Sequence, residues 1–323
     1  MDFKVLTIQK DDAGRRFDKI VKSVFPDKGL AEINGIIRKG LVKLNGKKAK
    51  NDMRVNEGDE LKAASFLFNT ENLSKEKTKS KILQEHNAQD SSLDFEIVFQ
   101  NQHLLFINKE YNTTVHGFSD SLDSKVKKYY SATSNTTSIS FKPGPLHRLD
   151  KKTTGLLCFS WSLEGARWFS ENIKTHQIKK YYIGIVEGKL ENCEKWEHNI
   201  EKSKAFGERD FHTVESSEDG KKAITWAEPL KYGRYKNKEI TLVSFRIETG
   251  RTHQIRYQSS SKGHPLLGDT AYGGSSIDKK DGYKQDFYLH AQNLEIGENP
   301  LGLPQIIKCK ETRDFEEFVK KHF

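Results

Sequence analysis

Residues 147–150 place a histidine, an arginine and an aspartate within four positions of the chain, in the order His-Arg-Leu-Asp. A proline and a glycine before them predict a turn, and the apolar run at 156–159 predicts a short buried strand after them. Asp150 is therefore expected in a loop that leads into a rigid element, where its carboxylate is exposed and still held in place. A lone aspartate in a loop is usually solvated or caps a turn, so a catalytic role needs a second feature.

That second feature is a basic, glycine-containing segment at 248–256, a hundred residues further along the chain. A guanidinium fixed beside a carboxylate keeps the carboxylate ionised and oriented, because the opposite charge favours the charged form. A nucleophilic or proton-abstracting aspartate needs such a partner. The two segments together therefore predict an active site built on an ionised carboxylate.

Five stretches in a fixed order resemble the RluA-type family of RNA pseudouridine synthases. The family pattern is HRLD with a T-S-G-L-L-like run, then K-x-Y-x-A-L-V-x-G, T-G-R-T-H-Q-I-R, G-H-P-x-x-G-D-x-x-Y-G and L-H-A. The corresponding stretches here are 147–157, 180–188, 249–256, 263–273 and 289–291. The resemblance thus covers roughly half of the chain.

The reaction implied by this resemblance cuts the bond between ribose C1′ and uracil N1, turns the base over and joins C5 to the same carbon. It involves no redox change, so no cofactor is expected. The sequence has no phosphate-binding loop, no dinucleotide-binding glycine motif and no metal-ligand spacing, and a zinc site made of scattered histidines and Cys309 is not supported. The reaction does need a dry pocket and a base taken out of its stack.

The resemblance also assigns roles to individual residues. Asp150 is the expected nucleophile or base, and attack on C1′, addition to C6 and proton removal at C2′ all stay open. Arg251 stands where the family pairs an arginine with this aspartate. Tyr182 matches the family's active-site tyrosine, whose ring stacks on the flipped uracil and whose hydroxyl assists removal of the C5 proton. Arg148 is expected to reach the RNA or, alternatively, to form a structural salt bridge.

The whole chain has 323 residues and a net charge of +9, which suits two domains and a polyanionic partner, with a solvated basic surface as the alternative. Its three cysteines form no C-x-x-C pair, which indicates a reducing compartment. No stretch of about 18 apolar residues occurs. We expect a cytoplasmic monomer without a membrane partner or a bound metal.

Residues 1–64 are expected to form a separate RNA-binding domain. Apolar residues at helical spacing predict helices over 17–25 and 30–37, followed by a strand at 41–44 and an Asn-Gly turn. This pattern resembles the S-four-like domain. Fifteen Lys and Arg stand against ten Asp and Glu, a net charge of +5. The residues expected to contact RNA phosphates, which position the enzyme without reading sequence, are Arg16, Lys19, Arg38, Lys39, Lys43, Lys47 and Lys48.

Residues 65–92 are polar and predict a flexible linker, and 93–323 are expected to form the catalytic domain. Apolar runs at 95–99, 104–107, 180–188, 221–226 and 240–247 predict strands, with one helix over 163–173. Strands with few long helices indicate an α+β fold with a mixed, largely antiparallel sheet.

One stretch departs from the family pattern. Relatives usually carry Lys-Pro-Ala-Gly after the second of these strands, and this chain has Lys-Glu-Tyr-Asn at 109–112. Because asparagine tolerates the left-handed backbone region, we expect Asn112 to take over the glycine position. The departure bears on the shape of this loop and on substrate choice more than on the chemistry.

The expected substrate is large-subunit (23S) ribosomal RNA, because relatives with an S-four-like domain mostly act on it. A tRNA substrate is the alternative within the enzyme class. A different class of function is an RNA-binding or ribosome-assembly factor whose catalysis is dispensable, and the altered stretch at 109–112 is the feature in its favour.

Overall fold

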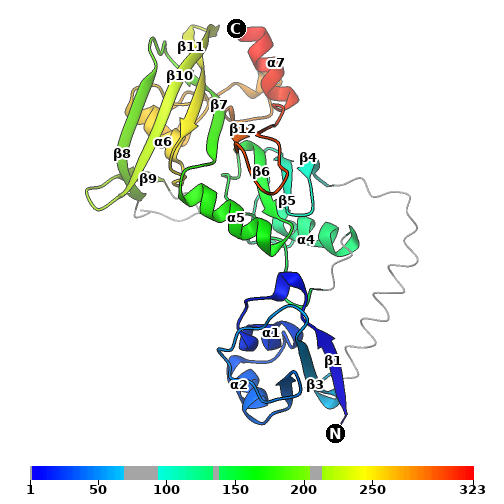
Figure 1. Cartoon of the computed structure of the whole chain (residues 1–323). Helices are drawn as coiled ribbons and strands as arrows, with labels where there is room; N and C mark the ends of the chain where they lie inside the picture. Colours follow the sequence, from blue (N-terminus) through cyan, green and yellow to red (C-terminus); the bar gives the residue numbers. More distant parts are fainter. Residues whose placement is uncertain (1, 69–93, 134–137, 204–212) are drawn as a thin grey trace. The chain divides into compact units, whose positions relative to one another are not determined.

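The computed structural model describes residues 2–68, 94–133, 138–203 and 213–323 (Figure 1). By contacts the chain divides into two compact units. The first takes its residues from Met1–Asp94 and from two later segments, Tyr130–Lys142 and Ser162–Glu164, and the second takes the rest. The domain limits 1–64 and 93–323 stay predictions, and the sequence did not indicate that later segments join the first unit. Most of the predicted linker lies outside the described residues.

The first unit is a small sheet with two helices. Its three strands lie in the order β1-β3-β2, and all pairs are antiparallel. Both predicted helices form, and Asn45 and Gly46 both have the positive φ that the predicted turn requires. The elements of this unit are β1 Phe3–Thr7, η1 Lys10–Asp12, α1 Phe17–Val24, α2 Leu30–Arg38, β2 Val42–Leu44, β3 Glu60–Ala64 and η2 Ser65–Leu67.

A buried carboxylate joins a later segment of the chain to this unit. Asp12 is fully buried, and its Oδ1 accepts hydrogen bonds from the backbone N–H of Ser140 (2.7 Å) and from the hydroxyls of Ser138 and Ser140. Its Oδ2 accepts from the N–H of Ile139 at 2.9 Å. A buried carboxylate requires such donors, because its burial without partners is costly. These bonds account for the membership of residues 138–142 in the first unit.

The second unit is built on one ten-stranded sheet in the order β4-β5-β6-β12-β7-β11-β10-β8-β9, with β13 on β12. All pairs are antiparallel except β12 with β6, so the predicted α+β fold with a largely antiparallel sheet is confirmed. The strands are β4 Glu96–Gln100, β5 Leu104–Lys109, β6 Thr154–Ser160, β7 Lys179–Glu187, β8 Glu194–Lys202, β9 Val214–Ser216, β10 Lys221–Tyr235, β11 Lys238–Ile247, β12 Leu289–Glu295 and β13 Ile306–Lys308.

Helices lie against both faces of this sheet (Figure 1). The aromatic side chains of Phe315 and Phe318 on α7 pack against Ile183 and Ile185 of β7. Successive side chains of a strand point to opposite faces, so Tyr182 on the same strand faces away from α7. The helices are α4 Leu122–Thr133, α5 Leu163–Lys174, α6 Gln254–Ser261 and α7 Arg313–His322, with 3-10 turns η3 Thr270–Tyr272 and η4 Lys279–Asp281. None of the helices in the described ranges has the length and apolar character of a membrane span.

Gly155 on β6 permits a close approach of β12 just after the Asp150 loop. Its φ is +105°, and a Cβ at this position would lie 2.3 Å from the carbonyl oxygen of Ala291. Both features exclude a side chain, because L residues rarely adopt this φ and the contact is with rigid backbone.

Gly155→Ala is expected to lower the free energy of unfolding by about 3 kcal/mol or more, through backbone strain and overpacking. Gly144→Ala is the matched control, since a Cβ there meets nothing within 4 Å. Urea denaturation of both variants measures the difference. Equal midpoints would show that β12 moves freely to admit the methyl group.

Candidate active site

Asp150 lies in the turn before β6, where two adjoining hollows meet. The larger hollow has a volume of about 780 Å³ and the smaller hollow about 60 Å³. The side chain of Asp150 is 17% exposed, so its carboxylate is accessible and still surrounded by protein. The smaller hollow brings together the candidate residues of the catalytic region, and it is lined by Arg148, Asp150, Tyr182 and Arg251, with His253 and Arg256 beside them.

The guanidinium nearest Asp150 belongs to Arg256, on the first turn of α6. Its Nη1 lies 3.9 Å from Oδ2 of Asp150. The other side of the same guanidinium makes a two-pronged contact, in which Nε and Nη2 donate to the two carboxylate oxygens of Asp269 at 2.6 and 2.8 Å. The rings of Tyr272 and Phe287 each lie 4.9 Å from its Cζ. Arg256 is thus fixed by a buried carboxylate and two aromatic faces, and it presents one free prong to Asp150.

His253 is the second group beside Asp150. Its Nε2 lies 3.6 Å from Oδ2 of Asp150, and its Nδ1 forms a 2.9 Å hydrogen bond with the Tyr272 hydroxyl. Burial lowers the pKa of His253, against the opposing effect of the Asp150 charge. A neutral imidazole with both nitrogens facing polar groups fits a framework role for this histidine.

The expected contact between Arg251 and Asp150 needs correction. Arg251 is exposed, and its Nε donates a 3.0 Å hydrogen bond to the carbonyl oxygen of Lys222 on β10. The physical reason is the backbone at His253, whose φ of +52° turns the chain immediately before α6. Arg251 precedes this turn and points toward β10, whereas Arg256 follows it and reaches Asp150. A catalytic role for Arg251 stays a prediction, but its partner is not Asp150 here.

Tyr182 lies on β7 and is buried, with 8% of its surface exposed. Burial raises the pKa of its phenol, and the negative charge of Asp150 raises it further. The hydroxyl therefore stays protonated at neutral pH. Arg148 is exposed and lines both hollows, and among the described residues no carboxylate lies within ion-pair distance of it. The salt-bridge alternative for Arg148 thus has no partner in the described part of the chain.

A buried lysine that we had noted only as part of the divergent stretch supports the Asp150 loop. Lys109 is fully buried, and its Nζ donates to the carbonyl oxygens of Glu110, Thr113 and Lys151 at 2.9 to 3.0 Å. Three donors thus meet three acceptors, one of them next to Asp150 in the chain. Burial lowers the pKa of Lys109 to about 7, opposed by the Asp150 charge.

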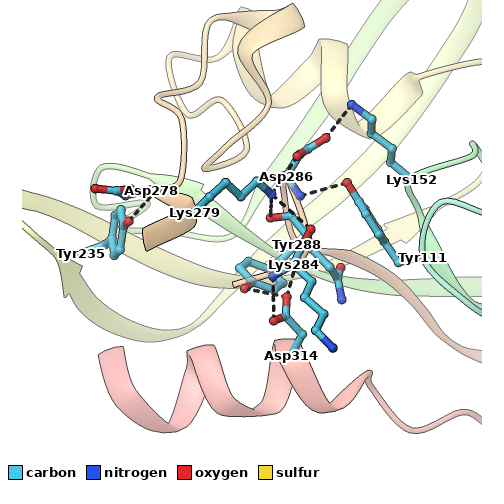
Figure 2. A network of polar contacts seen from close by, with 10 residues as sticks. Tyr111, Lys152, Tyr235, Asp278, Lys279, Lys284, Asp286, Tyr288 and Asp314 are labelled. Carbon is cyan, nitrogen blue, oxygen red and sulfur yellow. Dashed lines mark hydrogen bonds and ion pairs between the residues drawn. The ribbon is translucent and has the colours of Figure 1, made fainter. Parts of the chain in front are cut away.

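The divergent stretch at 109–112 also contacts the rim of the larger hollow. Asn112 has a φ of +61°, the left-handed backbone that the prediction of a glycine replacement requires. The hydroxyl of Tyr111 accepts a 3.0 Å hydrogen bond from the backbone N–H of Asp286 (Figure 2). The carboxylate of Asp286 bridges the ammonium groups of Lys152 and Lys279 at 2.7 and 2.9 Å. Burial acts to raise the pKa of Asp286, but these two cations outweigh it and hold the pKa at about 2.

The candidate phosphate-binding residues of the first unit lie mostly on its surface. Arg16 is paired with Asp18 at 2.8 Å, and the Nζ of Lys43 lies 4.9 Å from the centre of the Phe3 ring. The other five side chains are exposed. RNA contact stays a prediction for all seven residues, which are Arg16, Lys19, Arg38, Lys39, Lys43, Lys47 and Lys48.

Lys109→Met keeps the length and apolar stem of the side chain and removes the ammonium. We expect the free energy of unfolding to fall by about 3 kcal/mol, because three carbonyl oxygens around a buried site lose their shared donor. Lys151→Met, at an exposed neighbouring position, is the control. Urea denaturation of both variants tests this, and a Lys109→Met midpoint equal to that of the control would contradict the supporting role.

Two family models and several curated proteins match the chain. Residues 103–261 match the family model described as RNA pseudouridylate synthase, and residues 15–61 match that of the S4 domain. The protein named ribosomal large subunit pseudouridine synthase C from Rickettsia typhi is 30% identical over 295 residues, which cover 89% of this chain and 90% of that protein. The protein of the same name from Escherichia coli K12 is 26% identical over 289 residues, with 86% and 82% covered.

Two solved structures share the fold. Human RNA pseudouridylate synthase domain containing 4 has a TM-score of 0.55 at 22% identity and covers 78% of this chain and 98% of its own. Human RNA pseudouridylate synthase domain containing 1 has a TM-score of 0.51 at 21% identity, with 73% and 98% covered. At this level of identity, the likeness supports the fold alone.

Proposed function

This chain belongs to the family of RNA pseudouridylate synthases, and we propose that it isomerises uridine in large-subunit ribosomal RNA with Asp150 as the catalytic carboxylate. The observation that carries the proposal is the position of Asp150 in a hollow, within 4 Å of a guanidinium that is itself fixed. The substrate rests on the names of the relatives from Rickettsia typhi and Escherichia coli and on the S4 domain model at residues 15–61.

The proposed role of Arg256 is to keep Asp150 ionised and aimed. Pseudouridine formation requires a carboxylate that can attack C1′, add to C6 or remove the C2′ proton, and each route starts from the charged form. A cation at 3.9 Å favours that form. Because Asp269 holds the rest of the guanidinium, Arg256 needs no reorganisation when the substrate enters.

Tyr182 is proposed to supply its ring rather than a base. A phenol whose pKa is raised by burial and by Asp150 stays neutral, and it is a poor acceptor for the C5 proton. Its ring lines the same hollow as Asp150, where a flipped uracil would stack on it. Arg148, which lines the same hollow and has no acidic partner among the described residues, is free to contact the RNA.

The basic residues of the first unit are proposed to contact phosphates along the RNA and thus to orient it. A tRNA substrate remains the alternative, which the mapping experiment below separates. No observation favours a binding factor without catalysis, since the divergent stretch at 109–112 keeps the left-handed residue and supports the Asp150 loop.

Asp150→Asn is expected to abolish pseudouridine formation, because an amide can neither attack nor remove a proton. The measurement is pseudouridine mapping of total RNA from cells that lack the protein and carry wild type, Asp150→Asn or Asp219→Asn. Asp219 is an exposed aspartate in the turn before β10 and serves as control. We expect wild type and the control to restore large-subunit rRNA sites and Asp150→Asn to restore none.

Restored tRNA sites instead would replace the proposed substrate, and sites restored by Asp150→Asn would refute the catalytic role of this residue. The amounts of all three proteins, measured by immunoblot, exclude a difference in expression.

Arg256→Lys tests the orienting role. Lysine keeps the charge but loses the planar fork, so Asp150 should lose its alignment. We expect kcat to fall about 100-fold at saturating RNA, with a smaller change in KM. Arg313→Lys on α7 is the control, because Arg313 is exposed and lies outside both hollows. A loss confined to KM would instead assign Arg256 to RNA binding.

A further inference from the structure

A lysine with a buried side chain lies beside the candidate active site without an anionic partner among the described residues. Lys180 is on β7, two residues before Tyr182, and only 7% of its surface is exposed. Over the described ranges, its Nζ has no hydrogen-bond acceptor and no carboxylate within ion-pair distance. The Nζ would lie 3.6 Å from a Cβ on Gly250, a residue that lines the smaller hollow. Lys180 itself lines neither hollow, so its ammonium lies next to Gly250 at the edge of the smaller one.

The other buried charged side chains of the described structure all have partners. Lys109 meets three carbonyls, Arg256 meets Asp269, and Asp12 meets five donors. Asp18 is likewise paired with Arg16. Burial of an unpaired charge is costly, and burial is also the main cause that lowers the pKa of Lys180 to about 8. A lysine without a negatively charged partner, such as Lys180, is expected where a ligand supplies the negative charge.

A second cation lies close to the first. The positive charge of Arg251 lowers the pKa of Lys180 further, so the two groups repel each other in the free protein. Arg251 is held by the hydrogen bond from its Nε to the Lys222 carbonyl, and this bond leaves both terminal nitrogens of the guanidinium available. An anion bound between two such cations would relieve their repulsion and favour the charged form of both.

We propose that Lys180 and Arg251 together bind one backbone phosphate of the substrate RNA. This proposal rests on the proposed RNA-modifying function. Lys180 and Tyr182 are on the same face of β7, and two residues of a strand span about 7 Å. In a uridine stacked on Tyr182, the ribose separates the base from the phosphates. The distance from base to phosphate is therefore similar to the distance from Tyr182 to Lys180. The site would anchor the strand next to the flipped nucleotide, and it gives Arg251 a role away from Asp150.

The first test uses no RNA. Lys180→Met should raise the melting temperature of the free protein, because it removes an unpaired buried charge and its repulsion with Arg251. Inorganic phosphate should raise the melting temperature of wild type and leave that of Lys180→Met unchanged, since ligand binding stabilises the native state. A lower melting temperature for Lys180→Met, or equal stabilisation of both proteins by phosphate, would overturn the site.

The second test measures affinity for a large-subunit rRNA transcript by filter binding at several salt concentrations. Lys180→Met should raise Kd about tenfold, as expected for the loss of one charged hydrogen bond. It should also reduce the slope of log K against log salt by about 0.7, the value for one phosphate of a single strand. Lys179→Met is the matched control, because Lys179 is the neighbouring exposed lysine and pairs with Glu295.

Arg251→Gln and the double variant complete the experiment. If both residues hold one phosphate, the double variant should lose less affinity than the two single losses combined. Additive losses, or a Kd for Lys180→Met equal to that of Lys179→Met, would overturn the shared site. If neither wild type nor the control variant modifies the transcript, the proposed substrate is wrong. The effect of phosphate on the melting temperature of wild type would still test the phosphate site by itself.

Discussion

The buried ion pair between Arg256 and Asp269 is the constraint on which the active site depends. Asp269 is 2% exposed and Arg256 10%, so neither charge is compensated by water. Removal of either partner would leave an uncompensated charge in the interior, which typically costs 3–5 kcal/mol. The pair thereby fixes one guanidinium nitrogen 3.9 Å from Asp150, and among the residues described no other lysine or arginine lies within 4 Å of that carboxylate.

The loop that carries Asp269 is itself fixed by backbone packing. Gly268 has a φ of +93°, and a Cβ there would lie 1.7 Å from the carbonyl oxygen of Asp286. Asp286 in turn bridges Lys152 and Lys279 at the rim of the larger hollow (Figure 2). The position of Asp269, and through it of Arg256, therefore depends on the close packing of two loops of this region at Gly268.

Features that depend on local sequence were predictable. Apolar periodicity gave α1, α2 and the central strand β11, and the tolerance of asparagine for positive φ identified Asn112. Features that depend on distant contacts were not. Arg251 and Arg256 are five residues apart in one basic segment, and only the left-handed turn at His253 and the partner Asp269 decide which reaches Asp150. Arg256 could have been identified only from its place in the helix after that turn, and residue types alone do not reveal that turn.

Asp12 has a consequence for how the N-terminal module can be exchanged between proteins. Its carboxylate binds Ser138, Ile139 and Ser140, so the module is completed by a segment that follows it by more than a hundred residues. A chimera joined at the end of β3 would keep Asp12 but lose Ser138, Ile139 and Ser140, so the buried carboxylate would lose these donors. A transplant of the N-terminal module into another protein must therefore carry this short segment along to keep Asp12 paired.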